Sequence, residues 1–264
     1  MLVSLLLSSL CALQSTPSNT WANLMPRHAV PRRSFPMPKA SELLPLLTDR
    51  EAEMSERLEA LRALAYLDVK VDYLSLKAMK RNIHSDDALV SYVRCLARCS
   101  EEARAPMKKY LTHRLPAVRA EAVYGLSKYF EGGRDVARSF LSQRKLHPWQ
   151  RVAAIRALAE IDLSAAQVEV MRRMNSESGE VALEFLQVLR RDLSDDHIPV
   201  LIDLLKQGRS RITAEAAAML QHITGYRIGN DYRSWHVAYL QHKAFETPMR
   251  APETSDLELK TVAY

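Results

Sequence analysis

Glycine is scarce in this sequence: 7 of the 264 residues are glycine, whereas average usage is about 7% of a chain. No Gly-x-Gly-x-x-Gly and no Gly-x-x-x-x-Gly-Lys-Ser/Thr run occurs, so the usual phosphate-binding loops of nucleotide folds are missing. Glycine costs roughly 1 kcal/mol in a helix interior, and its scarcity here accompanies many Leu, Ala, Arg and Glu residues. The composition therefore predicts an all-α fold.

Cysteine is also rare. The chain holds three cysteines, Cys11, Cys95 and Cys99, which form neither a disulfide framework nor a zinc-binding spacing. Cys95 and Cys99 lie four residues apart on a predicted helix, where two side chains seldom have the geometry of a disulfide. Both occupy positions that are small or apolar elsewhere in the chain, so we predict that they are core residues and not nucleophiles.

Residue patterns that carry catalysis or bind metals are missing too. There is no Gly-x-Ser-x-Gly run, and no pair of carboxylates stands apart from the scattered surface acids. Three histidines fall in predicted turns about thirty residues apart, and three near the C-terminal end lack the spacing of a zinc site. We therefore expect no enzyme activity, no cofactor and no bound metal. The histidines are His84, His113, His147, His222, His236 and His242.

Long hydrophobic runs are limited to residues 2–13, which consist of Leu, Val, Ala, Cys and Ser. This run is too short to span a bilayer, so no transmembrane segment is expected in the mature protein, and it fits the apolar core of a secretory signal. We predict a signal peptide at residues 1–14 and export to the periplasm or the medium. Because no acid precedes Glu42, an organellar transit peptide is an alternative, as is a cytoplasmic protein that begins at Met25 or Met37.

Two segments outside the regular part of the chain are predicted to be extended. We assign residues 15–50 to a Pro-rich basic linker with a short lead-in, because prolines cluster there. Residues 244–264 contain two prolines and no sustained apolar period, so they are predicted to form a flexible tail. The linker prolines are Pro17, Pro26, Pro31, Pro36 and Pro38.

An internal repeat of about 31 residues organises the chain between these segments. A key leucine returns every 30 to 32 residues, and the residues three and four before it are apolar or aromatic. Positions i, i−3 and i−4 share one helical face, so each repeat begins with an amphipathic helix, and a less regular apolar series follows it. The key leucines are Leu64, Leu96, Leu126, Leu158, Leu189 and Leu220, and the second series is Met79, Leu111, Leu141, Met174 and Leu205.

About six helix-turn-helix repeats therefore fill residues 51–243. Pro116 and Pro148 fall in the first turn of a first helix, where proline costs little, and Ser164 and Ser194 stand where second helices are expected to begin. One helical pair cannot bury its apolar face alone, but a stack of pairs buries a continuous one, which predicts an α-solenoid. The repeats are assigned to residues 51–83, 84–114, 115–145, 146–176, 177–208 and 209–243.

Two stretches carry a family resemblance. Residues 115–126, LPAVRAEAVYGL, and residues 150–158, QRVAAIRAL, resemble the first helix of a HEAT repeat. The short period is similar to the HEAT-like repeats of the phycobilin-lyase type. Residues 223–232 with Trp235 are similar to the closing unit of HEAT-repeat proteins that bacteria export. The resemblance implies a superhelical scaffold and is nearly silent on its partner.

Two sets of residues receive structural roles. Arg57, Arg119 and Arg151 occupy the position at which the HEAT family carries its recurrent arginine, so the resemblance implies a structural role for them. Tyr232 and Trp235 lie in the last repeat, where an end cap must cover the exposed core.

The middle repeats carry an excess of positive charge. Residues 104–173 hold 14 Lys or Arg and 6 Asp or Glu, whereas the flanking residues 51–103 and 174–243 are slightly negative. Second helices usually line the concave face of a solenoid, so a basic groove is expected to attract an anionic polymer, a nucleic acid or an acidic protein surface. The alternative is a solvated face balanced by nearby acids. The candidates are Arg104, Lys108, Lys109, Arg138, Arg144, Lys145, Arg172 and Arg173.

The function favoured by these patterns is a non-enzymatic scaffold whose concave surface holds a protein or peptide partner. One alternative is the binding of a polyanion or nucleic acid through the basic middle repeats. A further alternative, a chromophore lyase or its chaperone, is implied only by the resemblance in repeat period.

Overall fold

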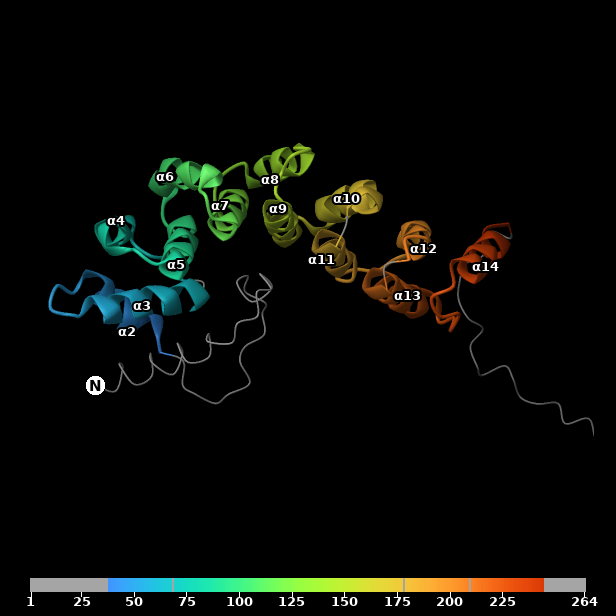
Figure 1. The fold of residues 1–264 in the computed structure, drawn as a ribbon, viewed down its shortest axis with the longest axis horizontal. Helices are drawn as coiled ribbons and strands as arrows, with labels where there is room; N and C mark the ends of the chain where they lie inside the picture. Colours follow the sequence, from blue (N-terminus) through green and yellow to red (C-terminus); the bar gives the residue numbers. More distant parts are fainter. Residues whose placement is uncertain (1–37, 68, 178, 209, 245–264) are drawn as a thin grey trace, which may run out of the picture. The chain divides into compact units, whose positions relative to one another are not determined.

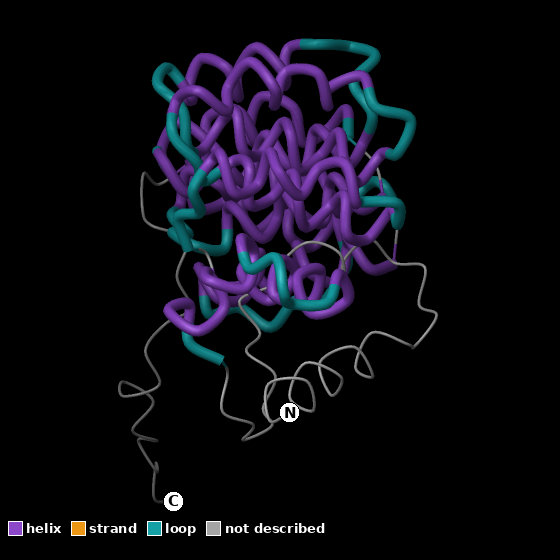
Figure 2. Tube along the Cα trace, turned by 90° about the vertical axis from the view of Figure 1, so that its left-hand side faces the viewer, coloured by secondary structure: helices purple, strands orange, loops and turns teal. Residues whose placement is uncertain are grey.

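The computed structural model describes residues 38–244 apart from residues 68, 178 and 209. Every regular element in this part is a helix, as Figure 2 shows, so the predicted all-α class is confirmed. No helix within the described part is long and apolar enough to cross a membrane. The expected signal peptide, residues 15–37 of the proline-rich linker and residues 245–264 of the expected tail lie outside the described residues.

The chain divides into two compact units, residues 1–161 and residues 162–264. The division falls inside the expected repeat at residues 146–176, between its two helices. We call them unit 1 and unit 2 and describe each by itself.

Unit 1 consists of short helices that pack in sequence order (Figure 1). Its first helices form a row in which α3 contacts α5, α5 contacts α7, and α7 contacts α9. Short 3₁₀ turns extend or precede the second helices at Lys80–Asn82, Glu101–Ala103 and Tyr110–Thr112. The α-helices are α2 (Ala40–Thr48), α3 (Met54–Leu67), α4 (Tyr73–Met79), α5 (Asp86–Ala97), α6 (Arg104–Lys109), α7 (Pro116–Lys128), α8 (Gly133–Ser142) and α9 (Pro148–Ile161).

The curvature of unit 1 differs from the expected arrangement. In Figure 1, the first helices α3, α5, α7 and α9 follow the inside of a curve, and the second helices α4, α6 and α8 lie on its outside. We call these the inner row and the outer row. We expected the second helices to line the concave side, and in unit 1 the figure shows the reverse.

Helix α2 was not predicted: the prolines favoured an extended linker over residues 15–40, and residues 41–50 were assigned only as a short lead-in to the first repeat. Leu43 and Leu47 are fully buried, and α2 packs against α3 and α4 although Pro45 lies inside it. A proline in a helix interior costs about 3 kcal/mol, whereas burying a leucine side chain contributes roughly 1.5–3 kcal/mol. The two leucines together therefore offset the cost of the proline.

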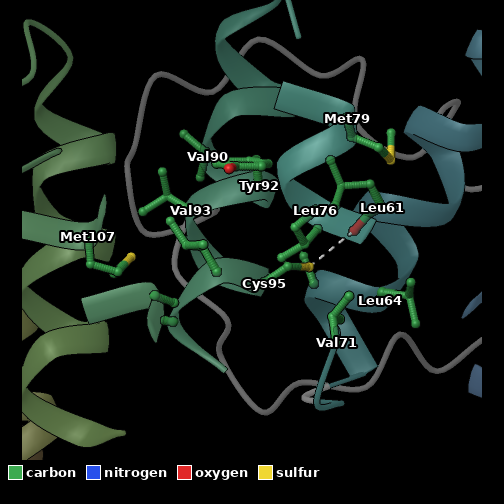
Figure 3. Close-up of a cluster of buried hydrophobic side chains, with 14 of the residues drawn as sticks. Leu61, Leu64, Val71, Leu76, Met79, Val90, Tyr92, Val93, Cys95 and Met107 are labelled. Atoms are coloured by element: carbon green, nitrogen blue, oxygen red, sulfur yellow. Dashed lines mark hydrogen bonds between the residues drawn. The ribbon is translucent and has the colours of Figure 1, made fainter. Parts of the chain in front are cut away.

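The predicted first-helix stripe is buried throughout. The key leucines and the residues three and four before them are all 6% exposed or less. In the second series Leu111 alone is half-buried, whereas Met79, Leu141, Met174 and Leu205 are buried. Figure 3 shows part of this core in unit 1, where Leu61, Leu64 and Cys95 lie together.

The helices begin at the prolines and capping residues predicted for them, with one exception. Helices α7 and α9 begin at Pro116 and Pro148, and Ser194 caps the turn that leads into a second helix. Ser164 was expected to cap α10, but the cap is Asp162, whose carboxylate accepts a hydrogen bond from the backbone N–H of Ala165 at 2.9 Å. A carboxylate caps as well as a hydroxyl, so the helix starts earlier than the serine indicated.

Gly125 marks the closest contact between α7 and its neighbours. A Cβ atom added there would lie 2.5 Å from the Cβ of Ala97 on α5 and 2.7 Å from the Cε of Met107 on α6. Real Cβ atoms do not approach other atoms so closely, so either the helices or the side chains must shift when the glycine is replaced.

We therefore expect Gly125→Ala to destabilise unit 1 by about 1–3 kcal/mol through overpacking. In an uncrowded helix the same substitution would stabilise by about 1 kcal/mol, so the sign of the effect is diagnostic. Urea unfolding followed by circular dichroism measures it. Adding Ala97→Gly to the variant should restore part of the loss, and a stabilising Gly125→Ala would contradict the close approach.

Unit 2 contains the remaining helices. Helix α11 packs against α10 and α13, and α12 packs against α13 and α14. The elements are α10 (Leu163–Arg173), α11 (Gly179–Leu189), α12 (Ile198–Leu205), α13 (Ser210–Thr224) and α14 (Tyr232–Ala244), with 3₁₀ turns at Met174–Ser176 and Asp195–His197.

A buried histidine closes the turn before α12. The Nδ1 atom of His197 accepts a hydrogen bond from the backbone N–H of Ser194 at 3.0 Å, and the side chain is 6% exposed. Burial lowers the pKa of His197 because it disfavours the imidazolium, although Asp196 and Asp192 oppose this. Only an unprotonated Nδ1 can accept the bond, so the folded state favours neutral His197.

This histidine should make the stability of unit 2 pH-dependent. Its folded pKa lies below the ordinary value near 6.5, so its contribution is present above pH about 6.5 and is lost as the pH falls through the folded pKa. We expect His197→Leu, which removes the acceptor, to be less stable than wild type by about 0.5–1.5 kcal/mol at pH 8, and this gap to narrow at pH 5. Unfolding curves at both pH values test this, and a constant gap would argue against it.

Candidate binding surfaces

The three recurrent arginines lie at the joints between successive helical pairs. The Nη2 atom of Arg57 donates a hydrogen bond to the carbonyl of Leu47 at 2.8 Å. The Nη1 atom of Arg119 donates to the carbonyls of His113 at 2.8 Å and of Arg114 at 3.0 Å. Each guanidinium thus joins its own first helix to carbonyls of the segment that precedes it.

The third arginine makes the same kind of contact. The Nη2 atom of Arg151 points to the carbonyls of Gln143 and Arg144 at 3.3 and 3.4 Å, just after α8 ends. In the other three repeats the residue at this position is not an arginine, so no guanidinium hydrogen bond of this kind can form. These residues are Leu89, Ala182 and Thr213.

A cluster of polar side chains joins α7 to α9 on the inner row. The Nζ atom of Lys128 lies 2.6 Å from a carboxylate oxygen of Glu160, and the hydroxyl of Tyr124 donates to the same oxygen at 2.8 Å. Lys128 also lies 5.4 and 4.8 Å from the ring centroids of Tyr124 and Tyr129. Lys128, Tyr124, Tyr129 and Glu160 therefore form one connected unit, which we call the inner cluster.

The inner cluster changes the proton affinity of its members. Burial alone would lower the pKa of Lys128, but its hydrogen bonds to Glu160 and Tyr124 outweigh burial and raise the pKa. Burial, followed by the charge of Glu160, raises the pKa of Tyr124. Near neutral pH Lys128 is thus an ammonium and Tyr124 a neutral phenol. This arrangement is typical of a structural contact and does not suit a general base.

Two arginines extend this polar network toward α3. Arg94 on α5 forms a buried ion pair with Glu121 on α7. Arg98 donates to the carbonyls of Leu64 and Ala65, the latter at 2.9 Å. The inner row therefore carries polar contacts at every step between α3 and α9.

The inner cluster was not predicted from the sequence. Its residues Tyr124, Lys128 and Glu160 lie at the positions two before and two after a key leucine, outside the apolar stripe. These positions hold polar or aromatic side chains in every repeat of unit 1, and this was the available signal. The residues two before are Arg62, Arg94, Tyr124 and Arg156, and those two after are Tyr66, Arg98, Lys128 and Glu160.

The predicted basic residues do not all form one surface. Arg104 pairs with Glu101 at 2.8 Å and donates to the carbonyl of Glu131 at 3.0 Å. Arg172 and Arg173 pair with Glu169 at 2.6 and 2.9 Å, and these two belong to unit 2. The other five lie on the outer row or just after α8, and all five are exposed. They are Lys108, Lys109, Arg138, Arg144 and Lys145.

The proposed end cap lies on α14. Trp235 is fully buried, and its indole N–H donates to the carbonyl of Gly229 at 2.7 Å. The ring of Tyr232 stacks on His236, and the Nζ atom of Lys206 on α12 lies 4.7 Å from its centroid. Val237 and Leu240 on the same helix stay about half exposed, so α14 covers the core but keeps apolar surface of its own.

Cys95 belongs to the core of unit 1, and the partly buried Cys99 packs against that core. Cys95 is fully buried, and its Sγ atom lies 3.6 Å from the carbonyl oxygen of Leu61, as Figure 3 shows. Burial raises the pKa values of Cys95 and Cys99 to about 12, so neither is a thiolate near neutral pH. Within the part of the chain that the structure describes, no group of three His, Cys, Asp or Glu side chains is placed to hold a metal ion.

Comparison with known proteins adds no assignment: no protein family, no curated protein and no solved structure matches this chain.

The arginine contacts at the joints lead to a stability prediction. Arg119→Met keeps the apolar stem but removes two charge-assisted hydrogen bonds, so we expect a loss of about 1–2 kcal/mol in the free energy of unfolding. The matched control is Arg114→Met, whose side chain is 80% exposed and forms only a 3.5 Å ion pair with Asp86. It should change stability by less than about 0.5 kcal/mol. Equal effects of the two substitutions in urea unfolding would refute the role of Arg119.

Proposed function

We propose that the protein is a non-enzymatic binding scaffold, an α-solenoid of HEAT-like repeats that presents the inner row of unit 1 to a protein or peptide partner. The observation that carries this proposal is the burial of the same three first-helix positions in every repeat. A chain that uses this helix face to stack its helical pairs forms an array of equivalent units. Arrays of this kind act mainly through their extended surfaces.

The inner row has the composition of a contact surface. Tyr66 is 48% exposed and Ile161 is 43% exposed, and Tyr66 occupies the repeat position that Lys128 and Glu160 hold further along the row. Tyrosine and arginine are enriched in protein interfaces, where exposed lysine and glutamate are depleted. The inner cluster holds Tyr124 and Lys128 in place before any partner arrives, which reduces the entropy lost on binding.

Export is a further part of the proposal. It rests on the apolar run at residues 2–13, which lies outside the described residues. N-terminal sequencing of the native protein tests it directly. A mature chain that begins between residues 13 and 24 supports a signal peptide, whereas a first residue of Met1, Met25 or Met37 contradicts it.

The partner-binding surface can be tested by paired substitutions. Tagged mature protein is cross-linked in an extract of its source cells, retained proteins are identified, and the binding of the purified partner is then measured by calorimetry. We expect Tyr66→Ala to weaken binding about tenfold or more, as loss of an interface tyrosine does. The matched control is Leu74→Ala, since Leu74 is 68% exposed on the outer row.

Three outcomes would overturn the proposal. The first is an equal loss of affinity in Tyr66→Ala and Leu74→Ala. The second is the absence of any protein or peptide that binds after purification. The third is turnover of a small molecule by the purified chain, which would also reopen the chromophore-lyase alternative if the molecule were a bilin.

A further inference from the structure

Basic residues recur at equivalent positions on α6 and α8. Counted from Leu96 and Leu126, the eighth, twelfth and eighteenth following residues are basic in both repeats. The buried positions match as well, since Ala103 and Met107 on the α6 side correspond to Gly133 and Ala137 on the α8 side. The two segments therefore turn the same face outward. The basic pairs are Arg104 with Arg134, Lys108 with Arg138, and Arg114 with Arg144.

A hydrogen bond places these two faces beside each other. The guanidinium of Arg104, at the start of α6, donates to the carbonyl of Glu131 at 3.0 Å, and Glu131 lies immediately before the cap of α8. Both α6 and α8 pack against α7 through short connections, so they run in the same direction. Lys108 lies four residues beyond Arg104, about 6 Å along α6, and Arg138 lies five residues beyond the start of α8 at Gly133, so both basic positions come shortly after this contact.

Arg104 and Arg114 pair with acids at this place, but most of the positive charges there have no such pair. Residues 104–114 and 132–147 together contain eight Lys or Arg and a single acid, Asp135. Seven of the basic residues are exposed, and for five of these no ion pair or hydrogen bond of the side chain occurs among the described residues. We call these five the outer basic patch. It consists of Lys108, Lys109, Arg138, Arg144 and Lys145.

The shape and composition of the patch restrict its ligand. It lies on the outside of the curve of unit 1 (Figure 1), where a rigid duplex or a flat bilayer would meet few of its charges at once. A flexible chain can follow such a surface. Residues 104–147, all of which the structure describes, expose no large aromatic or aliphatic side chain. Stacking of unpaired bases needs aromatic rings, and membrane insertion needs exposed apolar residues.

We propose that the outer basic patch binds a flexible linear polyanion that carries sulfate or phosphate groups and no nucleobases. Lysine and arginine side chains neutralise successive groups along the chain, and the release of counterions drives association. This surface lies on the outer row, opposite the one that we assign to a protein partner. The two proposals stand independently of each other.

The test uses the mature protein and two fluorescent probes of equal charge, a sulfated heparin-type oligosaccharide and a short linear polyphosphate. Fluorescence anisotropy gives the dissociation constant at several salt concentrations. With about five cations engaged, log Kd should rise with log salt with a slope of about 3 to 4. Lys108→Glu/Arg138→Glu should weaken binding about tenfold or more, and Lys108→Gln/Arg138→Gln should weaken it less.

A matched variant separates the patch from the net charge. Arg227→Glu/Arg233→Glu changes the charge by the same amount at exposed positions in unit 2 and should leave affinity near that of wild type. Thermal unfolding confirms that the variants remain folded. Binding of either probe with this pattern supports the proposal, and the preferred probe tells sulfate from phosphate.

The proposal fails on any of three results. One is the absence of binding of both probes at low salt. Another is an equal loss of affinity in the unit 2 variant, which would make net charge the cause. The last is tighter binding of duplex DNA, a single-stranded oligonucleotide or anionic vesicles at equal charge, which would point to a nucleic acid or a membrane surface.

Discussion

The apolar stripe on each first helix must be covered by the first helix of the next repeat, and most features of the described structure follow from that requirement. The second helix of the same repeat cannot by itself shield the three apolar positions of this stripe from water. In unit 1 the stripes are covered because α3, α5, α7 and α9 pack in a row. Small residues allow the close approach, as at Ala97 and Gly125, and each fully buried leucine contributes roughly 1.5–3 kcal/mol.

Close packing of the first helices brings polar groups out of water, and these groups have to be satisfied. An isolated ion moved into the interior costs several kcal/mol, so Arg94 is stable at the α5–α7 contact only because Glu121 accompanies it. At the α7–α9 contact Lys128 is likewise paired with Glu160, and the rings of two tyrosines lie beside its ammonium group. The polar contacts therefore specify which helix faces which, a task that interchangeable leucines and alanines perform poorly.

The apolar periodicity predicted the helical class, the buried stripe and the starts of α7 and α9, because these depend on residues close together in the sequence. It did not predict α2, because residues 41–50 come before the first repeat and the burial of Leu43 and Leu47 depends on packing against α3 and α4. Nor did it predict the inner cluster, whose contacts join residues about thirty positions apart. Which row faces the inside of the curve depends on packing angles between helices, which no local pattern reports.

The inner row of unit 1 carries paired charges and the outer row carries unpaired basic residues, which suits the two rows to different partners. On the inner row the charges are paired with each other, so a ligand would gain little from long-range attraction and must rely on shape and buried area. On the outer row the side chains of Lys108 and Arg138 take part in no ion pair among the described residues, and like charges on one surface raise the energy of the free protein. A polyanion relieves that repulsion when it binds, whereas a neutral peptide does not. Salt would therefore weaken binding at the outer row strongly and at the inner row only slightly.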